Sequence, residues 1–121
     1  LIQAVLNIAH NAAQALSEEI AQGIAQIELK TRVARSVTIS KHRYKMAMDL
    51  HVIDNGPGIP EDIRERIFFP LVSGRDGGSG LGLTLAQTFV QQHQGFIACD
   101  SRPGRTDFHI QIPYRRQEKA L

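Results

Sequence analysis

The sequence has 121 residues, a formal net charge of +2, 42% hydrophobic residues and 21% charged residues, which is the composition of one globular domain rather than of a disordered tail. No apolar run is long enough to cross a membrane, and the charge excess is too small to indicate a nucleic-acid-binding protein. The only cysteine, Cys99, cannot form an internal disulfide, so we expect a reducing, cytoplasmic location.

Hydrophobic periodicity and the positions of Gly and Pro divide the chain into short elements. In chain order, the predicted elements are a helix (1–16), a polar loop (17–23), a strand (24–34), a polar connection (35–43), a strand (44–53), a loop (54–60), a short helix (61–67), an irregular glycine-rich stretch (70–82), a helix (83–93) and two strands (96–100 and 108–112). This order predicts an α/β sandwich, in which a mixed, mostly antiparallel sheet of about five strands carries about three helices on one face.

The first predicted helix carries a polar stripe of Gln3, Asn7, Asn11 and Gln14, which recur every three or four residues and therefore share one face. One interpretation is the solvent-facing side of an amphipathic helix. The other is a metal site, because a neutral amide oxygen suits Mg²⁺ and does not repel the phosphates of a nucleotide. Asparagine is a poor helix former, so its repetition needs a reason, but the stripe alone does not decide between the two.

The segment from Asp54 to Pro60, with the sequence DNGPGIP, follows the second predicted strand directly. Gly56 and Gly58 suggest backbone that bends sharply or closely approaches a ligand. Asp54, at the end of the strand, could accept a hydrogen bond from an amino group such as that of adenine. The alternative is that the Asp-Asn-Gly sequence serves only as a turn.

A second glycine-rich stretch, Gly74 to Leu83, leads directly into a predicted helix. Glycine-rich backbone at a helix N-terminus presents free N–H groups and a positive dipole end to an anion, which favours a phosphate site. The spacing differs from the Walker P-loop, from the dinucleotide fingerprint and from the protein-kinase glycine loop. A flexible linker is the remaining alternative, although the regularly placed leucines argue against it.

Together and in this order, these features resemble the catalytic ATP-binding domain of sensor histidine kinases, within the superfamily that includes gyrase, Hsp90 and MutL. The resemblance covers nearly the whole chain through five segments: the N box (Asn7 to Ala12), the first glycine box (Asp54 to Ile59), the F box (Ile67 to Pro70), the second glycine box (Gly78 to Leu83) and a third conserved segment (Ser101 to Phe108). The stretch Phe69 to Arg75 is most similar to the nitrogen-regulation, or NtrB-type, kinases. The resemblance implies a Bergerat-type ATP-binding fold over residues 1–121.

The resemblance also implies ATP and Mg²⁺ as cofactors and assigns roles in binding them. Asn11 would coordinate the metal, and Asn7 would support the metal or the phosphates. Asp54, assisted by Thr106, would accept a hydrogen bond from the adenine amino group, and residues 70–82 would form a lid. The remaining expected nucleotide-binding residues are Gly56, Gly58, Ile59, Gly78, Ser79, Gly80, Leu81, Gly82 and Leu83.

The chain departs from the family pattern at two places. Many relatives carry a Lys or Arg shortly after the second N-box asparagine, where this chain has Ala13, Gln14 and Ala15. We therefore expect Arg75 to balance the phosphate charge as part of the catalytic machinery. Arg105 stands where many relatives have a second glycine, which leaves close backbone approach at that position open.

The sequence contains five histidines, and none has the H-E-x-x-N-P type of context of a phosphate-accepting histidine. Because the chain begins inside an apolar run, we expect a fragment of a longer kinase that lacks its dimerisation and phosphoacceptor helices. The fragment would bind ATP as a monomer and deliver its γ-phosphate to a histidine on that separate domain of a homodimeric parent. The resemblance further implies an NtrC-like response regulator, which the parent would also help to dephosphorylate, and the PII signal protein as partners, but no nucleic acid or membrane.

Two other functions use the same motifs. An ATP-gated dimerisation clamp of the gyrase–MutL type carries a general-base carboxylate four residues before the N-box asparagine, but that position is Asn7 here, and no acidic residue precedes Glu18. A serine kinase of the anti-sigma-factor type would phosphorylate a small partner protein. ATP-dependent dimerisation would support the clamp, and phosphoserine on a partner would support the serine kinase.

Overall fold

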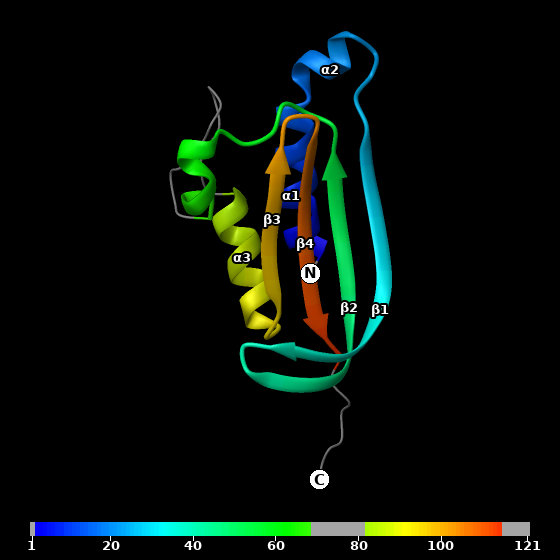
Figure 1. Cartoon of the computed structure of the whole chain (residues 1–121), viewed down its shortest axis with the longest axis vertical. Coiled ribbons are helices and arrows are strands. Elements are labelled where there is room, and N and C mark those ends of the chain that lie inside the picture. The colour runs from blue at the N-terminus through cyan, green and yellow to red at the C-terminus, as the bar shows by residue number, and fades with distance from the viewer. Residues whose placement is uncertain (1, 69–81, 115–121) are drawn as a thin grey trace.

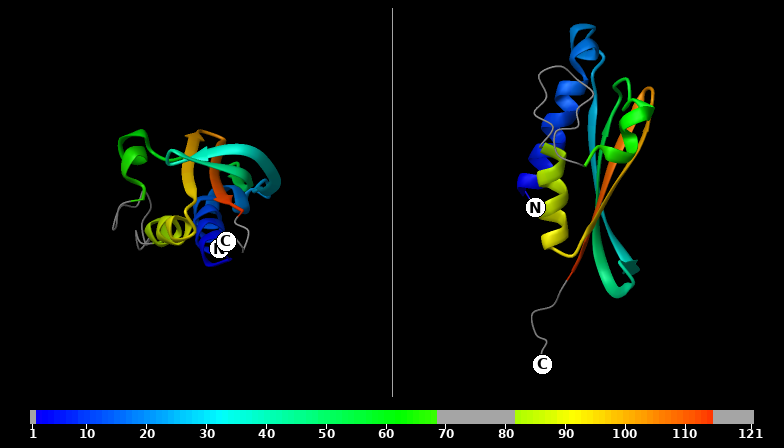
Figure 2. Two further views of the ribbon diagram at one scale, coloured as in Figure 1. Left: turned by 90° about the horizontal axis from the view of Figure 1, so that it is seen from below. Right: turned by 90° about the vertical axis from the view of Figure 1, so that its left-hand side faces the viewer.

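The computed structural model describes residues 2–68 and 82–114. The elements are α1 (Ile2–Ala15), α2 (Ser17–Ala21), β1 (Ile27–Ile39), β2 (His42–Asp54), the 3₁₀-helix η1 (Glu61–Arg66), α3 (Gly82–Gln92), β3 (Phe96–Arg102) and β4 (Arg105–Pro113). The long helices α1 and α3 pack side by side and cover one face of the sheet (Figures 1 and 2). No helix in the described part of the chain is both long and apolar enough to span a membrane.

The sheet confirms the predicted α/β sandwich. Its four strands have the order β1-β2-β4-β3, and each neighbouring pair is antiparallel. Within the described residues the sheet therefore has four strands rather than about five, and no parallel pair. Two long helices, rather than three, lie on its covered face, because the third predicted helix (61–67) is only the short 3₁₀-helix η1, and α2 lies beyond the end of the sheet (Figure 1).

The predicted polar connection at residues 35–43, whose form the sequence left open, is much shorter in the structure, because β1 and β2 continue through most of it as one long hairpin. The two strands pair from Ile27 opposite Asp54 to Ile39 opposite His42. The turn consists of Ser40 and Lys41 alone, with φ values of 49° and 69°. Two positive φ values match the twist of a type I′ hairpin turn, which usually carries Asn or Gly, so Ser40 and Lys41 carry no recognisable turn signal.

The predicted polar loop at residues 17–23 is also wrong in part, because Ser17–Ala21 forms the short helix α2. Glu18 and Glu19 lie in its first turn, where negative charge interacts favourably with the helix dipole. The chain then leaves the helix through Gly23, whose φ is +75°. A single helical turn produces too little periodicity to be recognised in a sequence.

The core lies between the helix pair and the sheet. Its fully buried side chains include Ile8 from α1, Val90 from α3, and Val52, Phe108 and Ile110 from the two central strands. Cys99 packs against this cluster, and burial raises the pKa of its thiol to about 12. The thiol is therefore protonated at neutral pH, and its packing rather than its reactivity explains its presence.

The opposite face of the sheet carries a polar cluster built around Asp49, which is only 2% exposed. Nε of Arg32 donates to Oδ2 of Asp49 at 3.1 Å, and Nε2 of Gln111 donates to Oδ1 at 2.8 Å. The ring of His109 stacks on that of His51 at 4.2 Å between centroids. Burial alone raises the pKa of Asp49, but the bonds from Gln111 and Arg32 and the nearby His109 outweigh it, so the pKa lies below its usual value.

These bonds predict that Asp49 stabilises the fold in its ionised form. The Asp49→Asn variant should lose about 1–2 kcal/mol in free energy of unfolding at pH 7, because hydrogen bonds to a charged group weaken. A lowered folded-state pKa means that this stability exists above the unfolded-state pKa near 3.8 and disappears as the pH falls through the folded value. Urea unfolding at pH 7 and below pH 4 checks this, and a difference between variants that does not shrink in acid would contradict it.

Candidate functional site

The predicted site residues within the described chain lie on elements that meet at one end of the sheet (Figure 1). At this end β2 finishes at Asp54, β3 turns into β4, α1 finishes and α3 begins. They come from several elements: Asn7 and Asn11 from α1, Asp54 from β2, Gly56, Gly58 and Ile59 from the loop after β2, Gly82 and Leu83 from α3, and Thr106 from β4. Of these residues, Asp54 and Thr106, which are 52 positions apart in the sequence, are direct neighbours in the sheet.

Asp54 and Thr106 lie buried side by side where β2 ends, and this pair is called the floor of the candidate site below. They are direct partners in the β2–β4 ladder, and each is 4% exposed. Oδ1 of Asp54 accepts a hydrogen bond from the backbone N–H of Gly56 at 2.9 Å. A buried carboxylate is costly unless its oxygens are hydrogen-bonded, so this arrangement maintains a strong acceptor at the strand end.

The loop after Asp54 packs tightly on the β3–β4 turn because Gly58 has no side chain. A Cβ atom there would lie 2.8 Å from the backbone O of Arg102 and 3.2 Å from the N of Pro103, and the φ of Gly58 is +90°. The backbone N–H of Gly104 also donates to the O of Gly56 at 2.9 Å. The Asp-Asn-Gly sequence thus belongs to a loop fixed on its neighbours rather than to an isolated turn.

Gly56 brings the same loop against the end of α1. A Cβ atom at Gly56 would lie 3.0 Å from Oδ1 of Asp54, 3.3 Å from Cδ2 of Leu16 and 3.4 Å from the O of Ala15. Ala15 lies one helical turn after Asn11, so the loop sits over the helix end to which the asparagine stripe leads. Close approach at Gly56 therefore places the second predicted motif against the C-terminal end of the helix that carries the first.

Two residues that sequence reasoning did not assign hold this loop in place. The side chain of Asn55 donates to the O of Ile24 at 2.7 Å and accepts from the N of Gln26 at 2.8 Å, which fixes the segment before β1. Ser101 bonds both Ile59 and Thr106. The contacts of Asn55, and that of Ser101 with Ile59, join residues far apart in the sequence. Only the fold reveals them, although both Asn55 and Ser101 lie inside the recognised motifs.

The two asparagines of α1 differ from the glutamines of the same stripe. Asn7 and Asn11 are half-buried, whereas Gln3 and Gln14 are exposed, so a purely solvent-facing stripe does not describe this helix. Oδ1 of Asn7 accepts from Nε2 of Gln3 at 3.3 Å, but its buried Nδ2 has no hydrogen-bond partner in the described part of the chain. An unpartnered buried N–H donor suits an anionic oxygen such as that of a phosphate.

Five predicted site residues lie outside the described residues: Arg75, Gly78, Ser79, Gly80 and Leu81. The two ends of their segment are held together, because Oγ1 of Thr84 donates to the O of Phe68 at 2.8 Å. The ring of Phe68 meets that of Phe108 edge to face at 6.3 Å, and Leu83 also packs against the core. The core thus anchors both sides of the glycine-rich segment.

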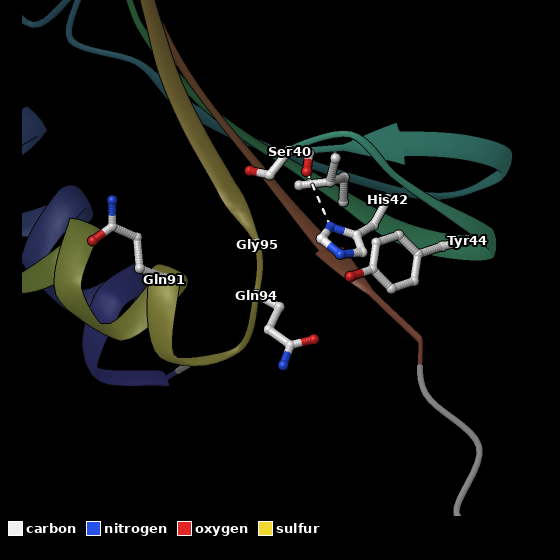
Figure 3. A pocket seen from close by; sticks show the side chains of 7 residues that line it. Ser40, His42, Tyr44, Gln91, Gln94 and Gly95 are labelled. Carbon is white, nitrogen blue, oxygen red and sulfur yellow. Dashed lines mark hydrogen bonds between the residues drawn. The ribbon is translucent and has the colours of Figure 1, made fainter. Parts of the chain in front are cut away.

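A pocket of about 430 Å³ lies at the other end of the sheet, between the tip of the β1–β2 hairpin and the end of α3 (Figures 1 and 3). It is lined by Ile39, Ser40, His42, Tyr44, Gln91, Gln94 and Gly95. Nδ1 of His42 lies 3.0 Å from the O of Ser40 within this lining. None of the predicted site residues contributes to it, so it does not belong to the candidate site.

Comparisons with known proteins agree with this geometry. The sequence profile of the histidine kinase-, DNA gyrase B- and HSP90-like ATPases matches residues 1–116. The chain is 45% identical over 114 residues to the sensory histidine kinase/phosphatase NtrB of Klebsiella oxytoca, a match that covers 94% of this chain and 32% of that protein. It is 39% identical to NtrB of Rhodobacter capsulatus over 98% of this chain and 33% of that protein. It therefore spans about a third of the length of these relatives.

Solved structures give the same result for the fold. The mycobacterial sensor histidine kinase MprB superposes with a TM-score of 0.69 at 27% identity, over 95% of this chain and 72% of that one. The catalytic domain of the histidine kinase ThkA superposes with a TM-score of 0.70 at 26% identity, over 92% of this chain and 64% of that one. The fold in which α1, the loop at residues 54–60 and the sheet end pack closely is thus similar to that of histidine kinase catalytic domains.

Proposed function

Because the chain belongs to the histidine kinase-, DNA gyrase B- and HSP90-like ATPase family, we propose that it binds Mg-ATP as the catalytic domain of an NtrB-type sensor histidine kinase. The observation that carries the proposal is the buried Asp54 beside Thr106, at a strand end closed by a loop that requires glycine. A buried carboxylate acceptor at this place suits the exocyclic amino group of adenine. The 45% identity to NtrB supports the subfamily.

Different residues of the chain bind different parts of the nucleotide. Asp54 accepts a hydrogen bond from the adenine amino group, and Thr106 assists it. The buried Nδ2 of Asn7 donates to a phosphate oxygen, and the amide oxygen of Asn11, one turn further along α1, holds Mg²⁺. When bound, Mg-ATP supplies the γ-phosphoryl group, and Mg²⁺ offsets part of the phosphate charge. Ile59 and Leu83, both packed against the core, border the base.

The glycine-rich segment completes the proposed site. The backbone N–H groups of Gly78, Gly80 and Gly82 donate to the phosphates at the start of α3. Ser79 and Leu81 lie between them, and Arg75 supplies the positive charge that Ala13 to Ala15 lack. Residues 70–82 cover the bound nucleotide. The core contacts that hold Phe68 and Leu83 support this placement, because they fix the two ends of the segment.

The proposed reaction requires a second domain. The chain positions the γ-phosphate for in-line transfer to a histidine on the dimerisation domain of its cytoplasmic, homodimeric parent. The phosphoryl group then passes to an NtrC-like response regulator, which the parent also helps to dephosphorylate under control of a PII signal protein. The support for these steps is the similarity to proteins named sensory histidine kinase/phosphatase NtrB.

The test combines this domain with the helical portion of its parent and with γ-labelled Mg-ATP. Acid-labile label on a histidine of the helical portion is the expected result, and this domain alone should carry no label. Calorimetry of the domain with Mg-ATP is the parallel measurement. Binding without label, accompanied by dimerisation, would favour an ATP-gated clamp, and label on a serine of a partner would favour a serine kinase. Absence of binding would overturn the proposal.

The proposed metal role of Asn11 predicts an effect of charge. The Asn11→Asp variant should bind Mg-ATP about tenfold more weakly, because a carboxylate repels the phosphates that a neutral amide accommodates. Calorimetric titration with Mg-ATP checks this prediction, and Gln14→Glu, which adds a negative charge on an exposed position of the same helix, is the matched control. Equal or tighter binding by Asn11→Asp would contradict the role of a neutral ligand.

A further inference from the structure

We propose that Ser101 is a positioning residue for adenine recognition: its hydroxyl fixes the loop at residues 54–60 and orients the hydroxyl of Thr106. Ser101 lies on β3, directly opposite Thr106 of β4 in the ladder. Thr106 in turn lies directly opposite Asp54 of β2. The three residues therefore form one row across three neighbouring strands, and the inference rests on the proposed nucleotide site at the end of that row.

Two short hydrogen bonds meet at the Ser101 hydroxyl. Its Oγ accepts from the backbone N–H of Ile59 at 2.8 Å. It also lies 2.8 Å from Oγ1 of Thr106, and either hydroxyl can donate in that pair. Among the described residues, the Ser101 side chain connects the loop at residues 54–60 to the floor of the site. Ile59 belongs to that loop, and the buried Thr106 belongs to the floor.

The Ser101–Thr106 contact restricts the Thr106 hydroxyl, which has one hydrogen and two acceptor lone pairs. Where Ser101 donates, the Thr106 hydrogen points to a different acceptor. Where Thr106 donates, its oxygen can only accept from other groups. In both cases the contact removes free rotation of a hydroxyl that lies beside Asp54. A fixed donor and acceptor pattern distinguishes bases by their polar edges, since buried polar groups left unpaired are costly.

The loop has other attachments, so loss of the Ser101 hydroxyl should leave the fold intact. Gly104 still donates to the O of Gly56, and the backbone at Gly58 still packs on that of Arg102. Ser101 is half-buried, and a Ser101→Ala substitution removes one oxygen atom without adding bulk. The substitution therefore separates orientation of the site from formation of the loop.

The experiment measures the affinities of the wild type, Ser101→Ala and Ser101→Thr for Mg-ADP and Mg-GDP. We expect Ser101→Ala to lose about five- to tenfold in ADP affinity, the effect of about one hydrogen bond, while its GDP affinity changes less. The ADP/GDP ratio should therefore fall, and Ser101→Thr, which keeps the hydroxyl, should restore it. The double variant Ser101→Ala/Thr106→Val should lose less ADP affinity than the sum of the two single losses, because Ser101 acts in part through Thr106.

A readout without nucleotide separates the inference from the proposed function. Amide hydrogen exchange at Ile59 should accelerate in Ser101→Ala, while that at Gly104 should not change, since its acceptor is retained. Unchanged Ile59 exchange, or an equal loss of ADP and GDP affinity, would overturn the inference while wild-type ADP binding sustains the proposed function. Absence of ADP binding by the wild type would overturn both. If Ser101→Ala fails to fold, Ser101→Cys replaces it, and ADP binding equal to that of Ser101→Thr would overturn the inference.

Discussion

Substitution of Gly58 by alanine should destabilise the domain by about 2–4 kcal/mol and weaken Mg-ATP binding more than tenfold. Two costs combine at this position. A φ of +90° is unfavourable for a residue with a Cβ atom. The new Cβ atom would also lie 2.8 Å from the O and 2.9 Å from the C of Arg102, which are backbone atoms that cannot rotate away. The loop would therefore have to move away from the β3–β4 turn.

A matched control separates the two costs. Gly104 has a nearly identical φ of +88°, but a Cβ atom there would meet nothing within 4 Å. The Gly104→Ala variant therefore reports the backbone cost alone, about 1 kcal/mol. Urea unfolding and calorimetry of both variants provide the measurement. If Gly58→Ala costs no more than Gly104→Ala, the close packing of loop and turn does not contribute to stability or binding.

The same loop shows how much the sequence predicts. The spacing of Gly56 and Gly58 indicated a sharply bent backbone or a close approach, and both glycines do make close approaches. The resemblance to histidine kinases predicted both glycines as nucleotide-binding residues. In the structure the neighbours on the Cβ side are the Arg102–Pro103 backbone for Gly58 and the end of α1 for Gly56. A pattern of glycines indicates positions where a side chain would not fit, but only the fold identifies the atoms that occupy the space.

Contacts across the sheet explain most of what sequence reasoning missed. Ser101 and Asn55 act through partners that are distant in the sequence, and a single sequence contains no signal for such pairing. The Asp49 cluster was missed for the same reason, since its partners Arg32 and Gln111 come from other strands. The two long helices and most strand positions were predictable, because they depend on local periodicity. The Ser40–Lys41 turn was not, because tertiary pairing imposes its positive φ values on residues that do not favour them.

The asparagine stripe required both kinds of information. Its spacing placed Asn7 and Asn11 on one face of α1, but spacing alone did not distinguish a solvent face from a ligand site. The half-buried positions and the unpartnered Nδ2 of Asn7 distinguish these residues from Gln3 and Gln14. A polar atom buried without a partner is rare in folded proteins, which is why it supports a phosphate contact more strongly than the sequence pattern does.

Substitution of Asp54 by alanine should weaken Mg-ATP binding about ten- to hundredfold. The proposed bond from the adenine amino group to this carboxylate is charge-assisted, which corresponds to about 1.5–3 kcal/mol. The expected loss is specific to the base, so affinity for inorganic triphosphate should change little. Calorimetry with both ligands measures this difference. Asp54→Asn, which can still accept from Gly56 but carries no charge, should fall between the wild type and Asp54→Ala.

Asp49 supplies the matched control, because it is a second buried carboxylate on β2, on the opposite face of the sheet. The Asp49→Asn variant should lose stability without losing affinity for Mg-ATP, whereas the variants of Asp54 should lose affinity in a folded protein. Comparison of the two positions separates loss of a buried charge from loss of a nucleotide contact. A folded Asp54→Ala variant with unchanged affinity would remove Asp54 from the site, and the proposed adenine contact would then have to be abandoned.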